Sequence, residues 1–270
     1  ISIDVPSGIY LGEDRDEKDV FVTPHVVLTF FAPKLPFLLP QIGRFIPYWE
    51  IINLPISYEF LKEVNTEYDY TTEKEIKRLL RTRHRFTHKG TYGHALVVGG
   101  SYGKVGAAVL SGKATLRSGA GLLTLLLPKC GYNIAQTVLP EAMVLTSSQE
   151  EELAPTDIPF SPNAIGIGIG MGTSPSAQGT LASLLRTFPN VPFVIDADAL
   201  NLVASSEDLQ RALPKNAILT PHPKELERLI GKWSDDLDRQ EKAKQFAKKH
   251  KVILVLKGAF TMITDGDHFW

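Results

Sequence analysis

From residue 95 onward, short apolar runs alternate with longer segments in which apolar residues recur at helical spacing. Nearly every residue of the short runs is apolar, which is typical of strands buried on both faces of a parallel sheet. The pattern therefore predicts an α/β domain with a mostly parallel sheet and helices on both faces. The predicted strands are 95–98, 122–127, 164–167, 193–195, 218–220 and 252–256, the predicted helices are 106–118, 176–188, 224–230 and 235–250, and a hairpin turn is predicted at 265–267.

The first 54 residues show a different pattern, in which short apolar runs are separated by prolines and other turn residues. These runs predict strands at 20–22, 26–31 and 49–52, and we expect no separate hydrophobic core here. The segment 63–83 is polar, and Thr72 followed by Glu75 is the signature of a capping box at the start of a short helix. We therefore place a domain boundary between residues 57 and 71, which divides the chain into 1–62 and 63–270.

The composition fits a folded protein with a large core, since 43% of the 270 residues are hydrophobic. The 29 basic and 30 acidic residues are interleaved, so the chain offers no broad basic surface for nucleic acid or an anionic membrane. The most apolar stretch, 26–40, is interrupted by Pro33, Lys34 and Pro36 and is too short to cross a bilayer as a helix. A single cysteine, Cys130, leaves no intramolecular disulfide framework and favours a reducing compartment. We expect a cytoplasmic protein without nucleic-acid or membrane partners.

The candidate chemistry lies in loops that follow predicted strands, where open α/β sheets bind their ligands. In HKGTYGHALVVGGSYGKVGAA (88–108), several glycines separate a predicted strand from a predicted helix, and free N–H groups at a helix start favour a phosphate. The stretch is not a Walker A loop, because Val105 follows Lys104. The alternative is that these glycines serve only a tight turn and close helix packing. The glycine run at 164–174 misses the dinucleotide fingerprint and is equally typical of a strand that another backbone crosses closely.

Two carboxylates, Asp196 and Asp198, directly follow the predicted strand at 193–195. Carboxylates in this place can order the water shell of Mg²⁺ or bind a substrate hydroxyl, or one of them can cap the next helix. His222 lies between two prolines that restrict the backbone and aim the imidazole toward a cleft. The alternative is a surface histidine, with Glu225 only complementing the helix dipole.

Lys257 and Thr261 follow the last buried strand and suit a nucleotide phosphate or ribose. Two other functions are poorly supported by the sequence. His84 and His88 have a spacing that can hold zinc, but the basic residues around them would repel a dication. A Ser-His-Asp hydrolase is the second poorly supported function.

Six segments, taken in order, resemble the ATP- or ADP-dependent NAD(P)H-hydrate dehydratases, a ribokinase-like family. They are HKGTYGHALVVGGS, GAAVLSGKATLRSGAGLLTL, IGIGIGMGTS, DADALN, TPHPKE and LKGAFT, and the resemblance covers about residues 72 to 270. The start of the chain, SIDVPSG followed by LTFFAPKLP, resembles the end of the NAD(P)H-hydrate epimerase domain. The resemblance implies a ribokinase-like sheet preceded by a fragment of a Rossmann-like α/β domain.

The dehydratase resemblance implies that ADP or ATP, with Mg²⁺, phosphorylates the hydroxyl that water has added to the nicotinamide ring, and that loss of phosphate restores NAD(P)H. It implies substrate contacts at Ala107, Gly168, Gly170 and His222, with Asp196 and Asp198 as hypothetical contributors, and nucleotide contacts at Lys257, Gly258, Ala259, Phe260 and Thr261. The chain has Gly168-Ile169-Gly170 where the family usually reads GPG. The family's catalytic aspartate lies in a GTGD segment that would follow Trp270, so we assign no catalytic residue within the 270 residues.

The epimerase resemblance implies that Asp4 contacts substrate and that Ser7 binds K⁺. The glycine-rich nucleotide segment of that domain is not present in the sequence, so epimerase activity is expected only of the complete protein. We expect this complete protein to be bifunctional, to act on the small molecule NAD(P)H hydrate and to form a homo-oligomer.

Two other functions stay open at this point. A ribokinase-like kinase of a small alcohol or vitamin precursor would share the fold, but TPHPKE, DADALN and the epimerase-like start favour the dehydratase. A kinase would leave a stable phosphorylated alcohol, whereas a dehydratase would regenerate the absorbance of the reduced nicotinamide. A non-catalytic nucleotide-binding module is the third candidate, and an intact GTGD segment after residue 270 would count against it.

Overall fold

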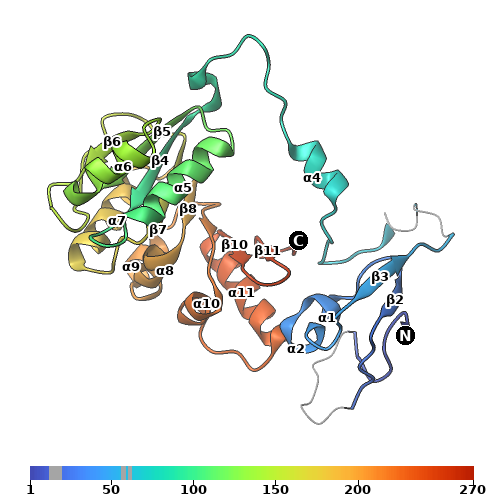
Figure 1. Cartoon of the computed structure of the whole chain (residues 1–270). Coiled ribbons are helices and arrows are strands. Elements are labelled where there is room, and N and C mark those ends of the chain that lie inside the picture. Colours follow the sequence, from blue (N-terminus) through green and yellow to red (C-terminus); the bar gives the residue numbers. More distant parts are fainter. Residues whose placement is uncertain (12–19, 56–58, 60–62) are drawn as a thin grey trace.

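The computed structural model describes residues 1–11, 20–55, 59 and 63–270 and places them in two units joined by a linking segment (Figure 1). The larger unit holds an eight-stranded sheet of order β11-β10-β9-β8-β7-β4-β5-β6. Neighbouring strands are parallel, except that β11 pairs with β10 in the antiparallel direction. The predicted mostly parallel α/β fold is confirmed.

Every predicted strand and helix of the larger unit is present, and no bound moves by more than two residues. The strands are β4 (His94–Gly99), β5 (Leu122–Leu127), β6 (Met143–Thr146), β7 (Ala164–Ile169), β8 (Phe193–Ile195), β9 (Ile218–Leu219), β10 (Ile253–Leu256) and β11 (Met262–Thr264). The helices are α5 (Val105–Arg117), α6 (Tyr132–Val138), α7 (Pro175–Thr187), α8 (Ala197–Ala204), α9 (Glu207–Arg211), α10 (Pro223–Ile230) and α11 (Asp236–His250). The sequence analysis missed β6, β11, α6 and α9 and gave no bounds for α8; these elements are short and carry little periodic signal.

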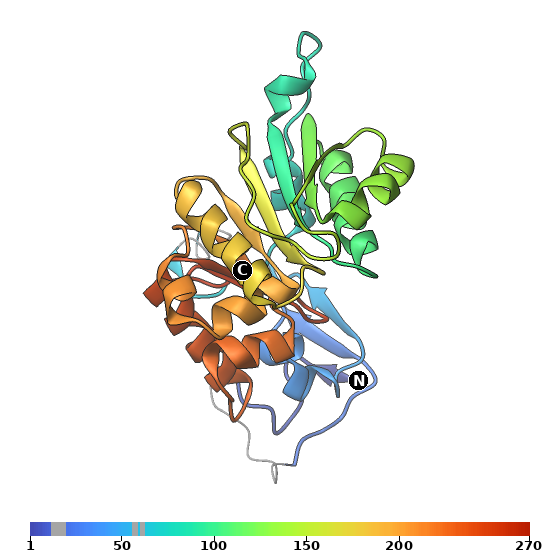
Figure 2. The ribbon, with the colours of Figure 1, turned by 90° about the vertical axis from the view of Figure 1, so that its left-hand side faces the viewer.

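Two hydrophobic layers cover the sheet, one on each face. Helices α7 to α11 pack against one face, where Leu96, Ile165 and Phe193 are fully buried. Helices α5 and α6 pack against the other face, over β4, β5 and β6, where Leu125 and Leu127 are fully buried. Figure 2 shows these helices on either side of the strands. Each such side chain contributes about 1.5–3 kcal/mol by leaving water, so the two layers fix the positions of the strand ends.

The N-terminal unit is a small parallel sheet with two one-turn helices. Its elements are β1 (Ser2–Ile3), β2 (Val27–Phe30), α1 (Leu35–Leu38), α2 (Pro40–Gly43) and β3 (Trp49–Ile52), with sheet order β1-β2-β3. The expected strand at 20–22 is wrong, because the Val22 amide donates to the Ser7 carbonyl in a loop and the side chains of Val20 and Val22 are exposed. The expectation of no separate core is also wrong, since Val27 and Phe37 are buried together in a small cluster.

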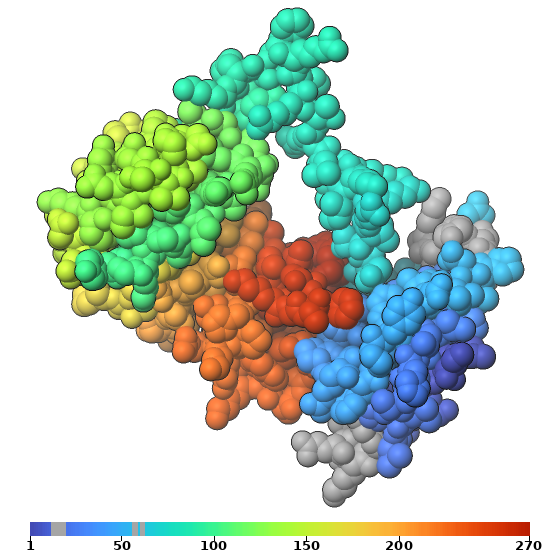
Figure 3. Space-filling model, in the orientation of Figure 1, coloured from blue at the N-terminus to red at the C-terminus, as the bar shows by residue number. Residues whose placement is uncertain are grey.

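The linking segment, residues 63–93, contains α4 (Glu73–Leu79) and a short 3-10 helix at Lys89–Tyr92. The predicted capping box is present, with the Thr72 amide donating to Glu75 at 2.7 Å. Figure 3 shows that the middle of this segment stands apart from the larger unit. Part of the expected boundary region, residues 57–58 and 60–62, lies outside the described residues.

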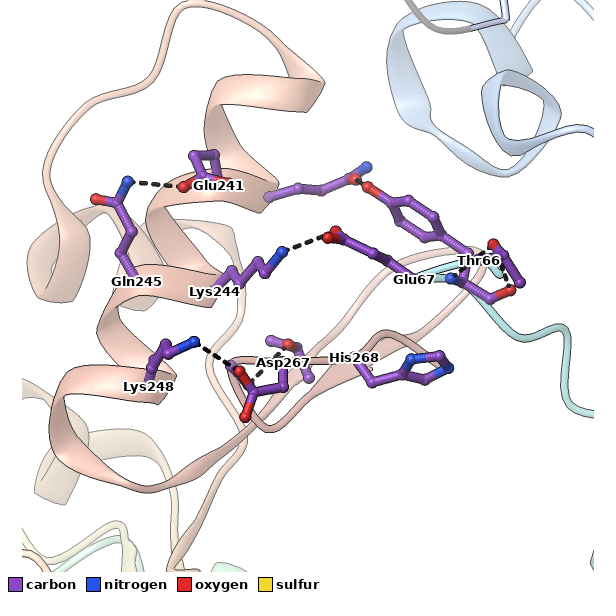
Figure 4. Close-up of polar contacts among 12 residues, drawn as sticks. Thr66, Glu67, Glu241, Lys244, Gln245, Lys248, Asp267 and His268 are labelled. Carbon is purple, nitrogen blue, oxygen red and sulfur yellow. Dashed lines mark hydrogen bonds and ion pairs between the residues drawn. The ribbon is translucent and has the colours of Figure 1, made fainter. Parts of the chain in front are cut away.

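The start of the linking segment is bound to α11 and to the end of β11. The Glu67 carboxylate lies 2.7 Å from the Lys244 ammonium, and Lys248 pairs with Asp267 at the same distance (Figure 4). Tyr68 stacks on Phe269 with ring centroids 5.1 Å apart, and the two residues form a parallel bridge. The predicted turn at 265–267 is present and leads back to Phe269, which pairs with Thr264. Among the helices of the described part of the chain, none is long and apolar enough to cross a bilayer.

Candidate functional site

The motif loops meet at one edge of the larger sheet, at the carboxyl ends of β4, β7, β8, β9 and β10. The loop after β4 is bound to the loop after β7, because the Gly100 amide donates to the Ile169 carbonyl at 2.8 Å. The Ser101 hydroxyl donates to the Gly170 carbonyl at 2.9 Å. Parallel strand order thus brings loops about 70 residues apart together at this edge.

Backbone conformation and close neighbouring atoms explain why residues 168 and 170 are glycines. Gly168 has φ of +122°, and a Cβ there would lie 1.9 Å from the Asp196 carbonyl oxygen. Gly170 has φ of +65°, and its Cβ would lie 3.0 Å from the Lys104 Cβ and 3.7 Å from the Ala107 Cβ. The structure therefore brings Ala107, Gly168 and Gly170 together, with Lys104 as a neighbour that the sequence analysis had not singled out.

Gly106 differs from these glycines. A Cβ at Gly106 would meet no atom of the described residues within 4 Å, although the residue lies in the first turn of α5. The close-packing alternative thus explains Gly168 and Gly170, but it does not explain Gly106. The first turn of α5 presents backbone without a covering side chain at this position.

Two of the helix starts at this edge lack a side-chain cap. Helix α5 begins after Lys104 and α8 begins after Asp196, and neither N-cap side chain bonds to its helix. By contrast, Ser174 caps α7 and His222 caps α10. Uncapped N–H groups carry about half a positive charge at each helix start and attract anions. The alternative in which Asp196 or Asp198 caps α8 is not what the structure shows.

The two carboxylates have different partners. Asp196 Oδ1 lies 2.8 Å from the Lys257 ammonium, and Asp198 Oδ2 accepts from the Gly172 amide at 2.9 Å. Between them, Ala197 has φ of +52°, a left-handed conformation that costs a non-glycine residue free energy. This backbone turn directs one carboxylate toward the nucleotide-segment lysine and the other toward the glycine-rich turn after β7.

His222 is bound within the start of α10. Its Nδ1 accepts from the Lys224 amide at 3.1 Å, and its Nε2 lies 3.2 Å from Glu225 Oε1. The other carboxylate oxygen of Glu225 accepts from the His222 amide at 2.9 Å, and the Glu225 side chain is 7% exposed, whereas that of His222 is 45% exposed. Glu225 therefore does more than complement the helix dipole, because it holds an exposed imidazole in one orientation.

The segment 257–261 connects β10 to β11. The Lys257 amide donates to the Pro221 carbonyl at 3.3 Å, which places this segment beside the His222 loop. A Cβ on Gly258 would lie 3.2 Å from the Phe260 carbonyl oxygen, so the turn is tight. The Phe260 ring is 45% exposed, and Ala259 and Thr261 border a cavity of about 480 Å³. Of the five predicted nucleotide residues, Lys257 thus lies next to the Asp196 carboxylate, whereas Ala259, Phe260 and Thr261 border the cavity.

The acidic groups at this edge suit a Mg²⁺ site that a bound nucleotide completes, rather than one built from protein side chains alone. Asp196 and Asp198 can supply carboxylate oxygens or hold the water shell of the ion. Within the part of the chain that the structure describes, no group of three or more His, Cys, Asp or Glu side chains converges. A Mg²⁺ ion here would take its remaining ligands from nucleotide phosphates and water.

Asp4 and Ser7 lie in the N-terminal unit and do not join the other candidate residues. Asp4 Oδ1 accepts from the Phe30 amide at 3.1 Å and lies 3.1 Å from the Lys34 ammonium. Partial burial raises the pKa of Asp4, but the hydrogen bond from Phe30 and the charge of Lys34 outweigh it and hold this pKa below its ordinary value. The Ser7 side chain is exposed in the turn after Asp4.

Sequence reasoning missed the residues that hold the loops together. Lys104 and Ser101 appear in the quoted glycine stretch, but the sequence analysis assigned neither of them a role. Trp49 and Tyr70 come from other parts of the chain, and only the fold places them near Phe260. Contacts between units of this kind leave no periodic signal in a single sequence.

Comparison with known proteins identifies relatives of the chain. A family model described as NAD(P)H-hydrate dehydratase matches residues 95–270. A bifunctional NAD(P)H-hydrate repair enzyme of Coxiella burnetii is 34% identical over 267 residues, which are 98% of this chain and 53% of that protein. The ADP-dependent (S)-NAD(P)H-hydrate dehydratase of Neisseria meningitidis serogroup B is 34% identical over 207 residues, which are 73% of this chain and 66% of that protein.

Solved structures agree with the fold. The ADP/ATP-dependent NAD(P)H-hydrate dehydratase of Bacillus subtilis, co-crystallised with ATP and Mg²⁺, gives a TM-score of 0.59 at 31% identity and covers 74% of this chain and 70% of its own. A ribokinase-like protein of Enterococcus faecalis gives a TM-score of 0.65 at 22% identity, covering 76% of this chain and 72% of its own, and supports the fold alone. The chain spans about half the length of the bifunctional relatives it matches.

Proposed function

The chain belongs to the NAD(P)H-hydrate dehydratase family, and we propose that its larger unit carries out the nucleotide-dependent dehydration of NAD(P)H hydrate. The observation that carries this proposal is the convergence of the six motif segments at one edge of the sheet. Gly170 packs beside Ala107, and Asp196 pairs with Lys257 at 2.8 Å, so the substrate and nucleotide segments adjoin.

In this proposal the hydrated nicotinamide lies over the first turn of α5, beside Gly168, Gly170 and His222. The open backbone at Gly106 and the small side chain of Ala107 allow a ring to approach closely. The uncapped start of α5 stabilises negative charge on the oxygen that receives the phosphoryl group. Glu225 holds the His222 imidazole where it can contact the substrate.

ADP or ATP binds against residues 257–261 in the same proposal, and the Lys257 ammonium pairs with its phosphates. Asp196 and Asp198 would hold Mg²⁺ through its water shell, and the ion would neutralise the negative charge of the phosphates. The nucleotide's terminal phosphoryl group is transferred to the ring hydroxyl, whose proton is released. The C–O bond to this phosphate then breaks as the ring nitrogen donates its electron pair, and loss of a ring proton restores NAD(P)H.

The N-terminal unit belongs, in this proposal, to an epimerase that interconverts the two hydrate epimers in the complete protein. Asp4 contacts substrate there, and Ser7 contributes to a K⁺ site. The lowered pKa of Asp4 keeps its carboxylate ionised to a lower pH than that of an ordinary aspartate, and a carboxylate suits both a hydroxyl and a cation partner. We further propose that the complete protein is a cytoplasmic homo-oligomer whose partners are small molecules.

The test uses the complete protein, NADH hydrate, Mg²⁺ and either ADP or ATP. The expected result is nucleotide-dependent recovery of reduced-nicotinamide absorbance with release of one phosphate per molecule recovered. A folded protein that binds nucleotide but gives no recovery would overturn the dehydratase assignment. A stable phosphorylated alcohol as product would instead support a kinase of the same fold.

A further inference from the structure

An aromatic cluster joins the N-terminal unit to the proposed nucleotide segment. Trp49, on strand β3, has its ring centroid 6.4 Å from that of Phe260, with 38° between the ring planes. Trp49 also meets Tyr70 of the linking segment edge to face, with a centroid distance of 6.4 Å and an angle of 75°. Three parts of the chain that are distant in sequence therefore meet at one tryptophan.

The contact with the Trp49 ring supports Phe260, which lies on a turn that is otherwise exposed to solvent. Its side chain is 45% exposed, and the turn borders the cavity of about 480 Å³ that separates it from Leu35 and Leu38 of the N-terminal unit. The turn is tight, because a Cβ on Gly258 would lie 3.2 Å from the Phe260 carbonyl oxygen. Gly258 directly follows Lys257, so the placement of the Phe260 ring bears on the placement of the lysine.

Trp49 is itself held in a fixed place relative to the larger unit. The Gln41 amide, on α2 of the N-terminal unit, donates to Asp236 Oδ2 at 2.8 Å. Asp236 begins α11, is 9% exposed and also lies 3.4 Å from Arg239. Figure 1 shows α1 and α2 against the start of α11, with β3 extending beside the linking segment. The contact at Gln41 and the contact at Trp49 together fix the orientation of the N-terminal unit.

We propose that Trp49 is a positioning residue for the nucleotide segment, so that the epimerase-like unit raises the affinity of the dehydratase unit for adenine nucleotide. This inference rests on the proposed function. Trp49 acts through Phe260 and touches neither substrate nor nucleotide. Without Trp49, the turn at 257–261 is free to adopt conformations in which Lys257 is misplaced. Only a fraction of the molecules is then ready to bind nucleotide, and the affinity for nucleotide falls by that fraction.

The experiment measures ADP binding by calorimetry, and the KM for ADP and kcat, in the complete protein. We expect Trp49→Ala to raise the Kd and KM for ADP by about 3- to 10-fold, the range that an aromatic pair provides, with kcat changed less than about twofold. Trp49→Phe keeps an aromatic ring and is expected to restore both constants to within about twofold of the wild type. Tyr48→Ala is the matched control, because Tyr48 is the preceding residue and its side chain is 56% exposed.

A double-mutant cycle with Phe260→Ala protects the test against a simple loss of folding. If Trp49 acts through Phe260, the variant with both changes binds ADP no more weakly than Phe260→Ala alone. Additive losses, or an unchanged ADP affinity in Trp49→Ala, would overturn the inference. A wild-type protein that does not bind ADP at all would overturn the proposed function instead.

Discussion

The ammonium of Lys257 lies 2.8 Å from Oδ1 of Asp196, and this ion pair joins the loops that follow β10 and β8 across the intervening strand β9. Both side chains are partly exposed, at 44% and 32%. Ion pairs of this exposure contribute about 0–1 kcal/mol to stability, so the pair is better explained by a need for charge at the site than by folding.

Lys257→Met is therefore expected to weaken ADP binding by about 10-fold or more while changing the free energy of unfolding by less than about 1 kcal/mol. Calorimetry with ADP and urea denaturation measure the two quantities. Lys215→Met is the control, since Lys215 is an exposed lysine at the opposite end of β9. Equal effects of the two substitutions on ADP affinity would contradict the role assigned to Lys257.

Gly168 and Gly172 allow a second test, because both have positive φ but only one is crowded. A Cβ at Gly168 would lie 1.9 Å from a backbone oxygen, whereas one at Gly172, with φ of +77°, would meet nothing within 4 Å among the described residues. Gly172→Ala is expected to cost about 1–2 kcal/mol, the strain of the left-handed conformation. Gly168→Ala is expected to cost more than about 4 kcal/mol or to prevent folding. Similar unfolding midpoints in urea would show that the backbone at Gly168 relaxes readily.

The stability of the larger unit is expected to depend on the protonation of His94. Its ring stacks on Phe160 with centroids 4.0 Å apart, its Nε2 lies 2.8 Å from the Thr124 hydroxyl, and burial holds its pKa below the ordinary value of 6.5. The folded state thus binds the proton less tightly than the unfolded state does. The contribution of neutral His94 to the free energy of unfolding is fully present above about pH 6.5, and it is lost as the pH falls through the lower pKa of the folded state.

We expect the urea midpoint of the wild type to fall between pH 7.5 and pH 5, and that of His94→Gln to fall less steeply. Burial and the nearby Lys249 charge also lower the pKa of His250, so part of the slope remains in the variant. His84→Gln, on the exposed linking segment, is the control and should keep the wild-type slope. A slope in His94→Gln that matches the wild type would refute the assignment to His94.

The sequence predicted the sheet because its strands are long apolar runs, such as 122–127, whose bounds are confirmed. The parallel order also places the carboxyl ends of the strands at one edge, and the structure brings Asp196 and Lys257 together there. That these residues bind ligand stays a prediction. The expected strand at 20–22 failed because apolar residues without a neighbouring strand to pair with remain in a loop. The Trp49 contact with Phe260 could not be predicted, because it depends on how two units dock.

The first turn of α5 provides the most direct test of where the substrate lies. Gly106 is a helical residue, and a Cβ there would meet no atom of the described residues within 4 Å. Alanine favours a helix over glycine by about 0.5–1 kcal/mol. Gly106→Ala should therefore stabilise the chain, as measured by the urea midpoint, unless something other than packing requires the glycine.

If the hydrated nicotinamide lies over this turn, the added methyl group intrudes on it, and the KM for NADH hydrate should rise about 10-fold in the complete protein despite the gain in stability. Lys113→Ala, at an exposed position further along α5, is the matched control and should leave the KM unchanged. A more stable Gly106→Ala protein with the wild-type KM would place the substrate elsewhere on this edge. A higher KM together with higher stability cannot result from a loss of folded protein, and it would support a ligand that lies against the added methyl group.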